Sequence, residues 1–388
     1  MLEWFKAVCV VDKLGNRLYL PAAKRIIGSI QPRGGMPVVP SFGRRRVSEK
    51  SKAGRVPTLV DVAAEAGVSR ATASLVLRGS KAITPATRSR VEAAMQALGY
   101  VYNRNAARLR AHSTQTVGVI LPNLTNPFFA TLLAGVESQV EPEGFSVLLG
   151  NCNEDPDRQD LFVNRMRENG VDGFIVCPAD RTERASLQRL TANAIPLVQI
   201  LRRVDGADSD FAGVDFLALT ADVVQRLVAL GHRRIAFVSG NMDHSVQRER
   251  IQGFRAGMKA AGLDPSLVIS IPLTHADGRA SAPFLMHRAT PPTAILCFND
   301  VVALGLHRGL QDLGLAIGHD VSLVGIDNVA ECDLMVPGLA SVETAPFRIG
   351  AAAGELFLRR LAAPEAPTRA RFEETAFVSR PSCGPAAS

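Results

Sequence analysis

Two hydrophobic periods follow one another along the chain, and the change between them lies near residue 115. Between residues 57 and 113 apolar residues recur every three or four positions, which is the spacing of one face of an α-helix. From Thr116 onward they gather into short β-rich runs, VGVILP, FSVLLG, GFIVCP, PLVQI, RIAFVSG, AILCF and SLVGI. The pattern predicts a small helical domain followed by a larger domain of another class.

Three short helices are predicted in the small domain. The first covers 58–66, and Gly67 ends it. Ser69 can cap a second helix over 70–78, and Thr84 can cap a third that has proline in its first turn. Two short helices joined by a glycine turn and supported by a third are typical of a helix-turn-helix.

The second helix presents a candidate recognition surface. Its small apolar positions, Ala73 and Val76, face the first helix, and this leaves another set of side chains exposed. The exposed set is Arg70, Ala71, Ser74 and Leu75. A purely structural helical hairpin would show the same apolar spacing, so this pattern alone leaves both interpretations open.

The distribution of charge favours DNA binding over a structural hairpin. Residues 1–56 hold 12 Lys or Arg and 3 Asp or Glu, and residues 57–113 hold 8 and 3, giving +9 and +5. Residues 114–388 hold 24 and 31, or −7, within a total of +7. A basic end on a mildly acidic body suggests a polyanion-binding part and a part that binds something else.

The β-rich runs alternate with helix-length segments such as 128–141, 217–230 and 301–313. This alternation predicts an α/β body of parallel strands with crossover helices. About ten strands are many for one sheet, so we predict two doubly wound parallel sheets in two lobes with a cleft between them. Ligands of such sheets bind at the carboxyl ends of strands, which makes the loops there the candidate site.

Residues 1–56 include a stretch rich in Pro, Gly, Ser and basic residues, so we expect a largely disordered extension. A start codon assigned too early and a basic arm that attracts phosphates would both account for it. The six cysteines stand singly, without metal-ligand spacing, and no apolar run has the length of a signal segment or membrane span. We expect a cytoplasmic protein with no metal, no cofactor and no membrane partner.

Several motifs, in order, resemble the lactose-repressor/galactose-repressor (LacI/GalR) family of transcriptional regulators. TLVDVAAEAGVSRATASLVLRG is similar to the family headpiece, and RSRVEAAMQALGYVYNRNAARLR to its third helix and hinge helix. TVGVILPNLTNPFFATLLAGVE, LGHRRIAFVSG, ILCFNDVVALG and DVSLVGIDN are similar to its regulatory body. The resemblance, from about Pro57 to Pro381, implies an all-α headpiece on a periplasmic-binding-protein-like two-lobed body, working as a homodimer on near-palindromic duplex DNA.

The resemblance also implies domain boundaries. They are a basic extension at 1–56, a headpiece at 57–102, a hinge helix at 103–113, an effector-binding and dimerisation domain at 114–383, and a tail at 384–388.

Individual DNA contacts follow from the same resemblance. It places Arg70, Ala71 and Leu75 at base edges, and of these Arg70 can make bidentate contacts to guanine. It places Thr58, Ser69, Thr72 and Asn103 at the DNA backbone. The three hydroxyl residues could instead be helix caps and surface groups.

In the hinge, the resemblance matches Leu109 to a leucine that wedges into a base step, with Arg108 and Arg110 beside it. A plain linker helix is the alternative. Tyr102 stands where the family usually has proline, which leaves the entry to the hinge helix less rigidly fixed.

For the effector cleft, the resemblance assigns Asn126, Phe128, Arg250 and Asp300. An arginine and an aspartate that face each other can bind hydroxyl groups through charge-assisted hydrogen bonds. Asp300 could instead cap a helix, Arg250 could form a surface ion pair, and Phe128 could belong to the core.

Two departures bear on the effector. Leu201 stands where the family commonly has aspartate, and Phe216 where it commonly has asparagine. The pocket should therefore be more apolar than a usual sugar site, although a sugar or a sugar derivative remains among the expected effectors.

These features predict a sequence-specific DNA-binding regulator, a repressor, whose operator affinity is controlled by a small molecule between two lobes. The alternative is a cytoplasmic binding protein of the solute-binding fold without a gene-regulatory role. An exported solute-binding protein would carry a leader and lack a headpiece. An enzyme is disfavoured because G-x-G-x-x-G, P-loop, H-E-x-x-H and G-x-S-x-G motifs are missing from the sequence.

Overall fold

The computed structural model describes residues 8–11, 17–20, 57–77, 79–100 and 113–386. The chain separates into two compact units, a headpiece within Lys24–Thr114 and a body that contains Gln115–Ser388 together with Met1–Ala23. Among the helices in these ranges, none combines the length and the apolar character needed to cross a bilayer.

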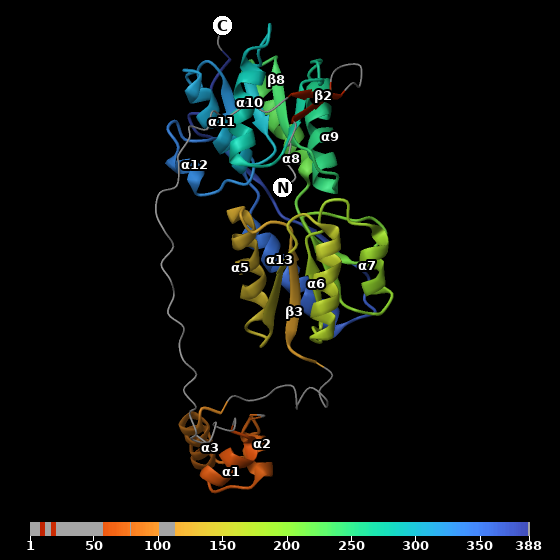
Figure 1. The fold of residues 1–388 in the computed structure, drawn as a ribbon, viewed down its shortest axis with the longest axis vertical. Coiled ribbons are helices and arrows are strands. Elements are labelled where there is room, and N and C mark those ends of the chain that lie inside the picture. Colours follow the sequence, from red (N-terminus) through yellow and green to blue (C-terminus); the bar gives the residue numbers. More distant parts are fainter. Residues whose placement is uncertain (1–7, 12–16, 21–56, 78, 101–112, 387–388) are drawn as a thin grey trace, which may run out of the picture. The chain divides into compact units, whose positions relative to one another are not determined.

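The headpiece consists of the three predicted helices, α1 (Leu59–Glu65), α2 (Arg70–Leu77) and α3 (Pro85–Leu98) (Figure 1). Gly67 adopts a φ of +62° in the turn between α1 and α2, where a left-handed backbone favours glycine. The core is built from small and branched side chains, which lets short helices approach closely. Its buried members are Val62, Ala63, Ala66, Ala73, Val76, Val91 and Ala94.

The N-terminal lobe of the body contains a six-stranded sheet in which every neighbouring pair is parallel, in the order β13-β7-β6-β5-β3-β4. Its strands are β3 (Thr116–Leu121), β4 (Ser146–Asn151), β5 (Gly173–Val176), β6 (Leu197–Ile200), β7 (Asp210–Gly213) and β13 (Ala370–Phe372). Its helices are α5 (Pro127–Val140), α6 (Pro156–Glu168), α7 (Arg184–Thr191) and α13 (Pro346–Ala362).

The C-terminal lobe repeats the plan around a four-stranded parallel sheet of order β11-β10-β8-β9. Its strands are β8 (Ile235–Gly240), β9 (Val268–Ile271), β10 (Ala294–Cys297) and β11 (Ser322–Val324). Its helices are α8 (Phe216–Ala229), α9 (Ser245–Ala260), α10 (His275–Met286), α11 (Asp300–Asp312) and α12 (Glu331–Leu334). The two predicted doubly wound lobes are therefore present (Figure 1).

The chain crosses between the lobes three times. It leaves the N-terminal lobe after β7, returns after β12 (Ser341–Glu343), and leaves again between β13 and β14 (Ala376–Val378). The crossing strands β12 and β14 pair antiparallel, with Val342 opposite Phe377. Each lobe is consequently assembled from separate stretches of sequence.

Helix α13 closes the N-terminal lobe by packing tightly on α5. A Cβ atom added at Gly135 of α5 would lie 2.1 Å from the carbonyl oxygen of Phe347, and one added at Gly350 of α13 would lie 2.0 Å from that of Leu132. Only glycine at these two positions lets the helix backbones come so close.

Both ends of the chain differ from the expectation. Within the extension, β1 (Val8–Val11) and β2 (Arg17–Leu20) pair antiparallel, because each is a β-rich run that composition averaged over 56 residues conceals. The remainder of 1–56 lies outside the described residues. At the other end, the backbone N–H of Gly384 donates to Ser322 and that of Ala386 to Leu230, so the body extends beyond the boundary expected at 383.

Candidate functional site

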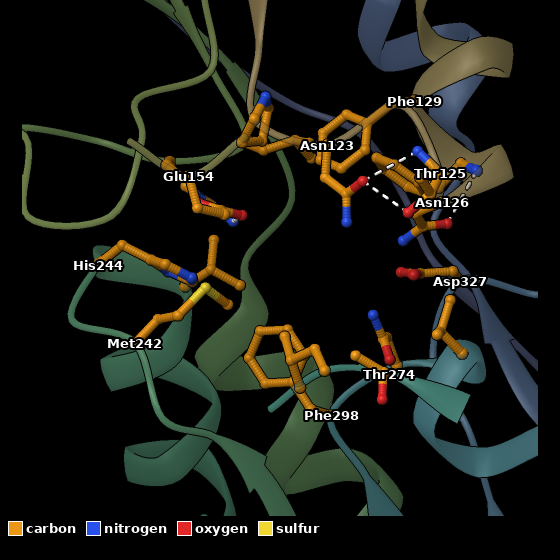
Figure 2. Close-up of a pocket in the computed structure, with 18 of the residues that line it drawn as sticks. Asn123, Thr125, Asn126, Phe129, Glu154, Met242, His244, Thr274, Phe298 and Asp327 are labelled. Carbon is orange, nitrogen blue, oxygen red and sulfur yellow. Dashed lines mark hydrogen bonds and ion pairs between the residues drawn. The ribbon is translucent and has the colours of Figure 1, made fainter. Parts of the chain in front are cut away.

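A cavity of about 540 Å³ lies between the two lobes of the body (Figure 2). One wall comes from the loops that follow β3, β4 and β6 in the N-terminal lobe. The other comes from the loops that follow β8, β9, β10 and β11 in the C-terminal lobe. All seven loops leave the carboxyl ends of parallel strands, which is where the sequence places the site.

Arg250 of α9 lies in the cavity wall with only 3% of its surface exposed. Its guanidinium carbon is 4.3 Å from the ring centre of Phe216 and 4.4 Å from that of Phe298, which gives two cation–π contacts. Nη1 donates to the carbonyl oxygen of Phe298, and Nη2 lies 3.7 Å from a carboxylate oxygen of Asp327. Burial lowers the pKa of Arg250 to about 10, so the group is charged at neutral pH.

Asp327 follows β11 and is 7% exposed. Burial raises the pKa of this carboxyl group to about 8, although the charge of Arg250 acts in the opposite direction. The nearby Asp300 raises it further, while a hydrogen bond with Asn126 lowers it. The raised pKa makes Asp327 a weaker counter-charge for Arg250 at neutral pH than an ordinary aspartate would be.

The second buried arginine of the cavity is already neutralised. Arg202 donates from Nη1 to Oε2 of Glu154 at 2.6 Å and from Nη2 to Oε1 at 2.8 Å, a bidentate ion pair. Nη1 also donates to the carbonyl oxygen of Pro178. The pair fixes the loops after β4 and β6 against each other.

His244 is the N-terminal cap of α9, and its Nδ1 accepts from the backbone N–H of Gln247 at 3.1 Å. Burial, helped by the positive charges of Arg202 and Arg250, holds the pKa of His244 far below its usual range, so the ring is neutral. With Nδ1 as acceptor, the ring proton lies on Nε2, which has no hydrogen-bond partner among the described residues.

Short polar contacts join the lobes next to His244. The backbone N–H of Asp243 donates to the carboxylate of Asp180 at 2.5 Å, and the carbonyl of Asp243 accepts from the N–H of Arg181 at 3.3 Å. The N–H of Arg203 donates to the hydroxyl of Ser245 at 2.8 Å. The loops of the N-terminal lobe thus hold the start of α9, on which the cavity wall is built.

The structure places three of the four predicted effector residues in the cavity wall, namely Asn126, Phe128 and Arg250. Their contact with an effector stays a prediction. The wall also contains Leu201 and Phe216, the two apolar departures from the family pattern.

Asp300 is not among the residues that line the cavity, and its predicted contact with an effector stays a prediction. Its carboxylate is fully buried in the C-terminal lobe, where it accepts from the hydroxyl of Ser341 at 2.7 Å and the backbone N–H of Val329 at 2.9 Å. Asn299 and Asp327 occupy the wall instead. Both residues stood in the motifs FNDVVALG and SLVGIDN, but spacing alone does not tell which side chain of a pair faces the cleft.

Replacing Asp300 by alanine should reduce the stability of the body. The hydroxyl of Ser341 and the N–H of Val329 would lose their acceptor, and an unsatisfied buried donor costs about 1–3 kcal/mol. Urea unfolding should show this loss for Asp300→Ala. Glu331→Ala, at an exposed carboxylate of the same lobe, serves as the control and should unfold within about 0.5 kcal/mol of the parent protein. Equal losses in both variants would contradict a purely structural role for Asp300.

In the headpiece, the candidate base-reading residues lie at the start of α2. Arg70 and Ala71 are exposed, and Ser74 and Leu75 are partly exposed on the same helix. Ala73 and Val76 are buried on the opposite face, as the apolar spacing predicts. This exposed face can approach a DNA groove without disturbing the headpiece core.

The hydroxyl residues of the headpiece have structural contacts of their own. Ser69 accepts from the backbone N–H of Thr72 at 3.0 Å, and both the N–H and the hydroxyl of Thr58 donate to Asp61 at 2.7 Å. These are the contacts of helix caps, and they leave a role at the DNA backbone as a prediction. The predicted hinge residues Asn103, Arg108, Leu109 and Arg110 lie outside the described residues.

No cluster of three or more His, Cys, Asp or Glu side chains within the described ranges has the arrangement of a metal site. The described residues present two candidate binding surfaces, one exposed on α2 and one in the cavity between the lobes.

Two family models match the chain. The model described as bacterial regulatory proteins, lacI family, matches residues 58–103, and the one described as periplasmic binding proteins and sugar binding domain of LacI family matches residues 114–376. The chain belongs to the LacI family. Membership accounts for the helix-turn-helix headpiece and the two-lobed α/β body, and it makes this chain a DNA-binding transcriptional regulator with an effector-binding domain.

Individual LacI-family proteins resemble this one over most of its length. Catabolite control protein A of Priestia megaterium is 32% identical over 305 residues, which are 78% of this chain and 92% of that protein. The HTH-type transcriptional repressor PurR of Vibrio vulnificus is 32% identical over 312 residues, which are 78% of this chain and 92% of that protein. These relatives are transcriptional regulators rather than enzymes.

Solved structures of LacI-family regulators show the same fold. A complex of the regulator CelR with cellobiose matches with a TM-score of 0.64 and 29% identity over 84% of this chain and 99% of that one. The lac repressor dimer bound to operator and the anti-inducer ONPF matches with a TM-score of 0.76 and 24% identity over 85% of this chain and all of that one. The second comparison concerns the fold alone.

Proposed function

We propose that this LacI-family chain is a cytoplasmic, dimeric repressor that binds a near-palindromic operator and is controlled by a small molecule in the cleft between its lobes. The observation that carries the proposal is the presence, on one chain, of an exposed face on α2 and a cavity lined by both lobes. The relative PurR is a transcriptional repressor, and the CelR complex with cellobiose shows a regulator of this fold that binds a small molecule.

Recognition of the operator is assigned to the start of α2. Arg70 can donate two hydrogen bonds to the O6 and N7 atoms of guanine in the major groove, and Leu75 can contact a thymine methyl group. Thr58, Ser69 and Thr72 would set the register on the phosphates, with Ala71 and Ser74 at the interface. Leu109 in the hinge would wedge into a base step, and this role stays a prediction from the family pattern.

The effector would control operator binding by changing how the two lobes are arranged. A ligand that contacts the loops of both lobes binds a closed arrangement better than an open one, and so shifts the population toward it. Asn126 and Phe128 on one side and Arg250 and Asp327 on the other are placed for such contacts. The difference in free energy between the two arrangements is what links effector binding to operator binding.

Selection of bound sequences from a random pool of duplex DNA tests the proposal directly. The purified full-length protein should enrich an inverted repeat of two half-sites, because a symmetric dimer presents two identical headpieces. Enrichment of no sequence would favour the alternative, a small-molecule binding protein without a regulatory role. Enrichment of a single unrepeated half-site would contradict dimeric binding.

A further inference from the structure

The charged groups of the cavity leave one cation without a full partner. Arg202 is paired with Glu154 through two hydrogen bonds, and His244 is neutral. Arg250 faces Asp327 at 3.7 Å, which is too long for a hydrogen bond. Burial raises the pKa of Asp327 to about 8, which weakens the counter-charge that Asp327 offers to Arg250 at neutral pH.

One edge of the buried guanidinium of Arg250 lacks hydrogen-bond partners among the described residues. The rings of Phe216 and Phe298 pack on it, and Nη1 is occupied by a carbonyl oxygen. Nε has no hydrogen-bond partner among the described residues, and Nη2 has only the long contact to Asp327. Nε and Nη2 together form the side of a guanidinium that matches the two oxygens of a carboxylate.

Four helices direct their N-terminal ends at the same cavity. Their N-cap residues all belong to its lining: Asn126 of α5, His244 of α9, Thr274 of α10 and Asn299 of α11. The N-terminal end of a helix carries a partial positive charge, so all four favour an anion over a neutral ligand. This contribution adds to the charge of Arg250.

The remaining wall of the cavity contains polar and apolar side chains. Asn123, Thr125 and Asn153 belong to the polar part, and the apolar part comes from both lobes, with Phe128, Phe129, Leu201, Met242, Leu273 and Phe298. Hydroxyl groups placed against the apolar part would lose their hydrogen bonds to water without replacement. The body of a well-fitting ligand is therefore apolar rather than hydroxylated on every side. Figure 2 shows Phe129, Met242 and Phe298 facing the space that the ligand would occupy.

We propose that the effector is a small monocarboxylic acid with an apolar, ring-sized body, whose carboxylate binds the Nε and Nη2 edge of Arg250 at neutral pH. The proposal rests on the proposed function, because it names the ligand class of the cleft that controls operator binding. A neutral sugar is the competing ligand class. Binding of a carboxylate depends on the charge of Arg250, whereas binding of a neutral sugar depends on it much less.

The proposal has a consequence for pH dependence at Asp327. The charged or polar groups that face Asp327 are Arg250 from α9, Asp300 from α11, Glu343 from β12 and Asn126 from the start of α5. When Asp327 is protonated, it competes less for Arg250 and repels a carboxylate less. As the pH rises through about 8, Asp327 ionises, so it pairs with Arg250 and repels the carboxylate of the ligand. Affinity for a carboxylate should fall between pH 7 and pH 9, whereas affinity for a neutral polyol should stay level or rise.

Calorimetric titration of the full-length protein with matched acid and alcohol pairs tests the proposal. The probes are benzoate with benzyl alcohol, cyclohexanecarboxylate with cyclohexylmethanol, and glucuronate with glucose. In at least one of the two apolar pairs the acid should bind about tenfold more tightly at pH 7, or better. Arg250→Gln should weaken binding of that acid by about 10- to 100-fold. Arg255→Gln, on the exposed side of the same helix, removes the same charge and should leave it unchanged.

Three results would overturn the proposal: alcohols or glucose that bind as tightly as their acids, no acid that binds at millimolar concentration, or acid affinity that rises from pH 7 to pH 9. If Arg250→Gln does not fold, the proposal is tested by the matched acid and alcohol pairs and by the pH series on the parent protein. Operator selection with the same preparation separates the two claims. Selective operator binding without a preference for acids contradicts the ligand class alone, whereas loss of operator selection contradicts the proposed function.

Discussion

Replacing Arg70 by alanine should weaken operator binding more than any other single change on the exposed face of α2. Arg70 is exposed at the first turn of that helix and can donate two hydrogen bonds to one guanine. Loss of such a contact costs about 1–3 kcal/mol per half-site. A dimer on two half-sites should therefore lose roughly 30-fold to 10⁴-fold in affinity. Fluorescence anisotropy on the selected operator at fixed salt measures the loss.

Arg90→Ala on α3 is the matched control for charge. Arg90 is also exposed in the headpiece, so both variants lose one positive charge and its attraction to phosphates. Only Arg70→Ala should also change the selected sequence, by relaxing preference at one base position in each half-site. If the two variants select the same sequence as the parent protein, Arg70 contacts only the backbone.

The largest loss of stability is expected from Asp210→Ala. Asp210 is fully buried in β7, and its carboxylate pairs with Arg359 at 3.2 Å and with Arg360 at 2.8 Å near the end of α13. It also accepts from the backbone N–H of Arg369 at 2.8 Å, just before β13. Removing the anion leaves two partly buried cations without a counter-charge, which costs about 3–5 kcal/mol. Urea unfolding of the full-length protein measures this loss in the free energy of unfolding.

Asp222→Ala provides the comparison for an ordinary ion pair. Asp222 pairs with Arg226 one helical turn away at 2.7 Å, but the two side chains are 54% and 51% exposed. Solvent screens such pairs, and we expect a loss of under about 1 kcal/mol. If Asp210→Ala costs no more than Asp222→Ala, Asp210 does not hold α13 and β13 to the sheet.

Most of the fold could be predicted from the sequence because its elements leave a periodic signal. All seven β-rich runs that were singled out are strands, and the three headpiece helices begin and end near the predicted caps. The strands of the body that the pattern does not predict, β7, β9, β12, β13 and β14, have three or four residues each, as do β1 and β2 in the extension. In β7 the buried Asp210 further interrupts the apolar pattern, and its partners Arg359 and Arg360 lie about 150 residues away in the chain.

The candidate site was less accessible to sequence reasoning, and Asn299 and Asp300 show why. In an α-helix each residue turns the side-chain direction by about 100°. At the start of α11, Asn299 caps the helix beside the cavity, and one step later Asp300 points into the lobe toward Ser341. Asp327 lies after a separate strand, and only the folded chain shows that it is the carboxylate beside Arg250.

The repeated crossing of the chain between lobes has a consequence for synthesis on the ribosome. The N-terminal lobe needs α13, which packs against α5 and the sheet strands β5, β6 and β7. About 150 residues separate the end of β7 from the end of α13, and translation at about 5–20 residues per second takes roughly 7–30 s to add them. During that interval the nascent lobe exposes apolar surface to chaperones and to neighbouring chains on the same messenger. Among the described residues, the headpiece core comes from positions between 59 and 100, so the headpiece can fold while the body is still being synthesised.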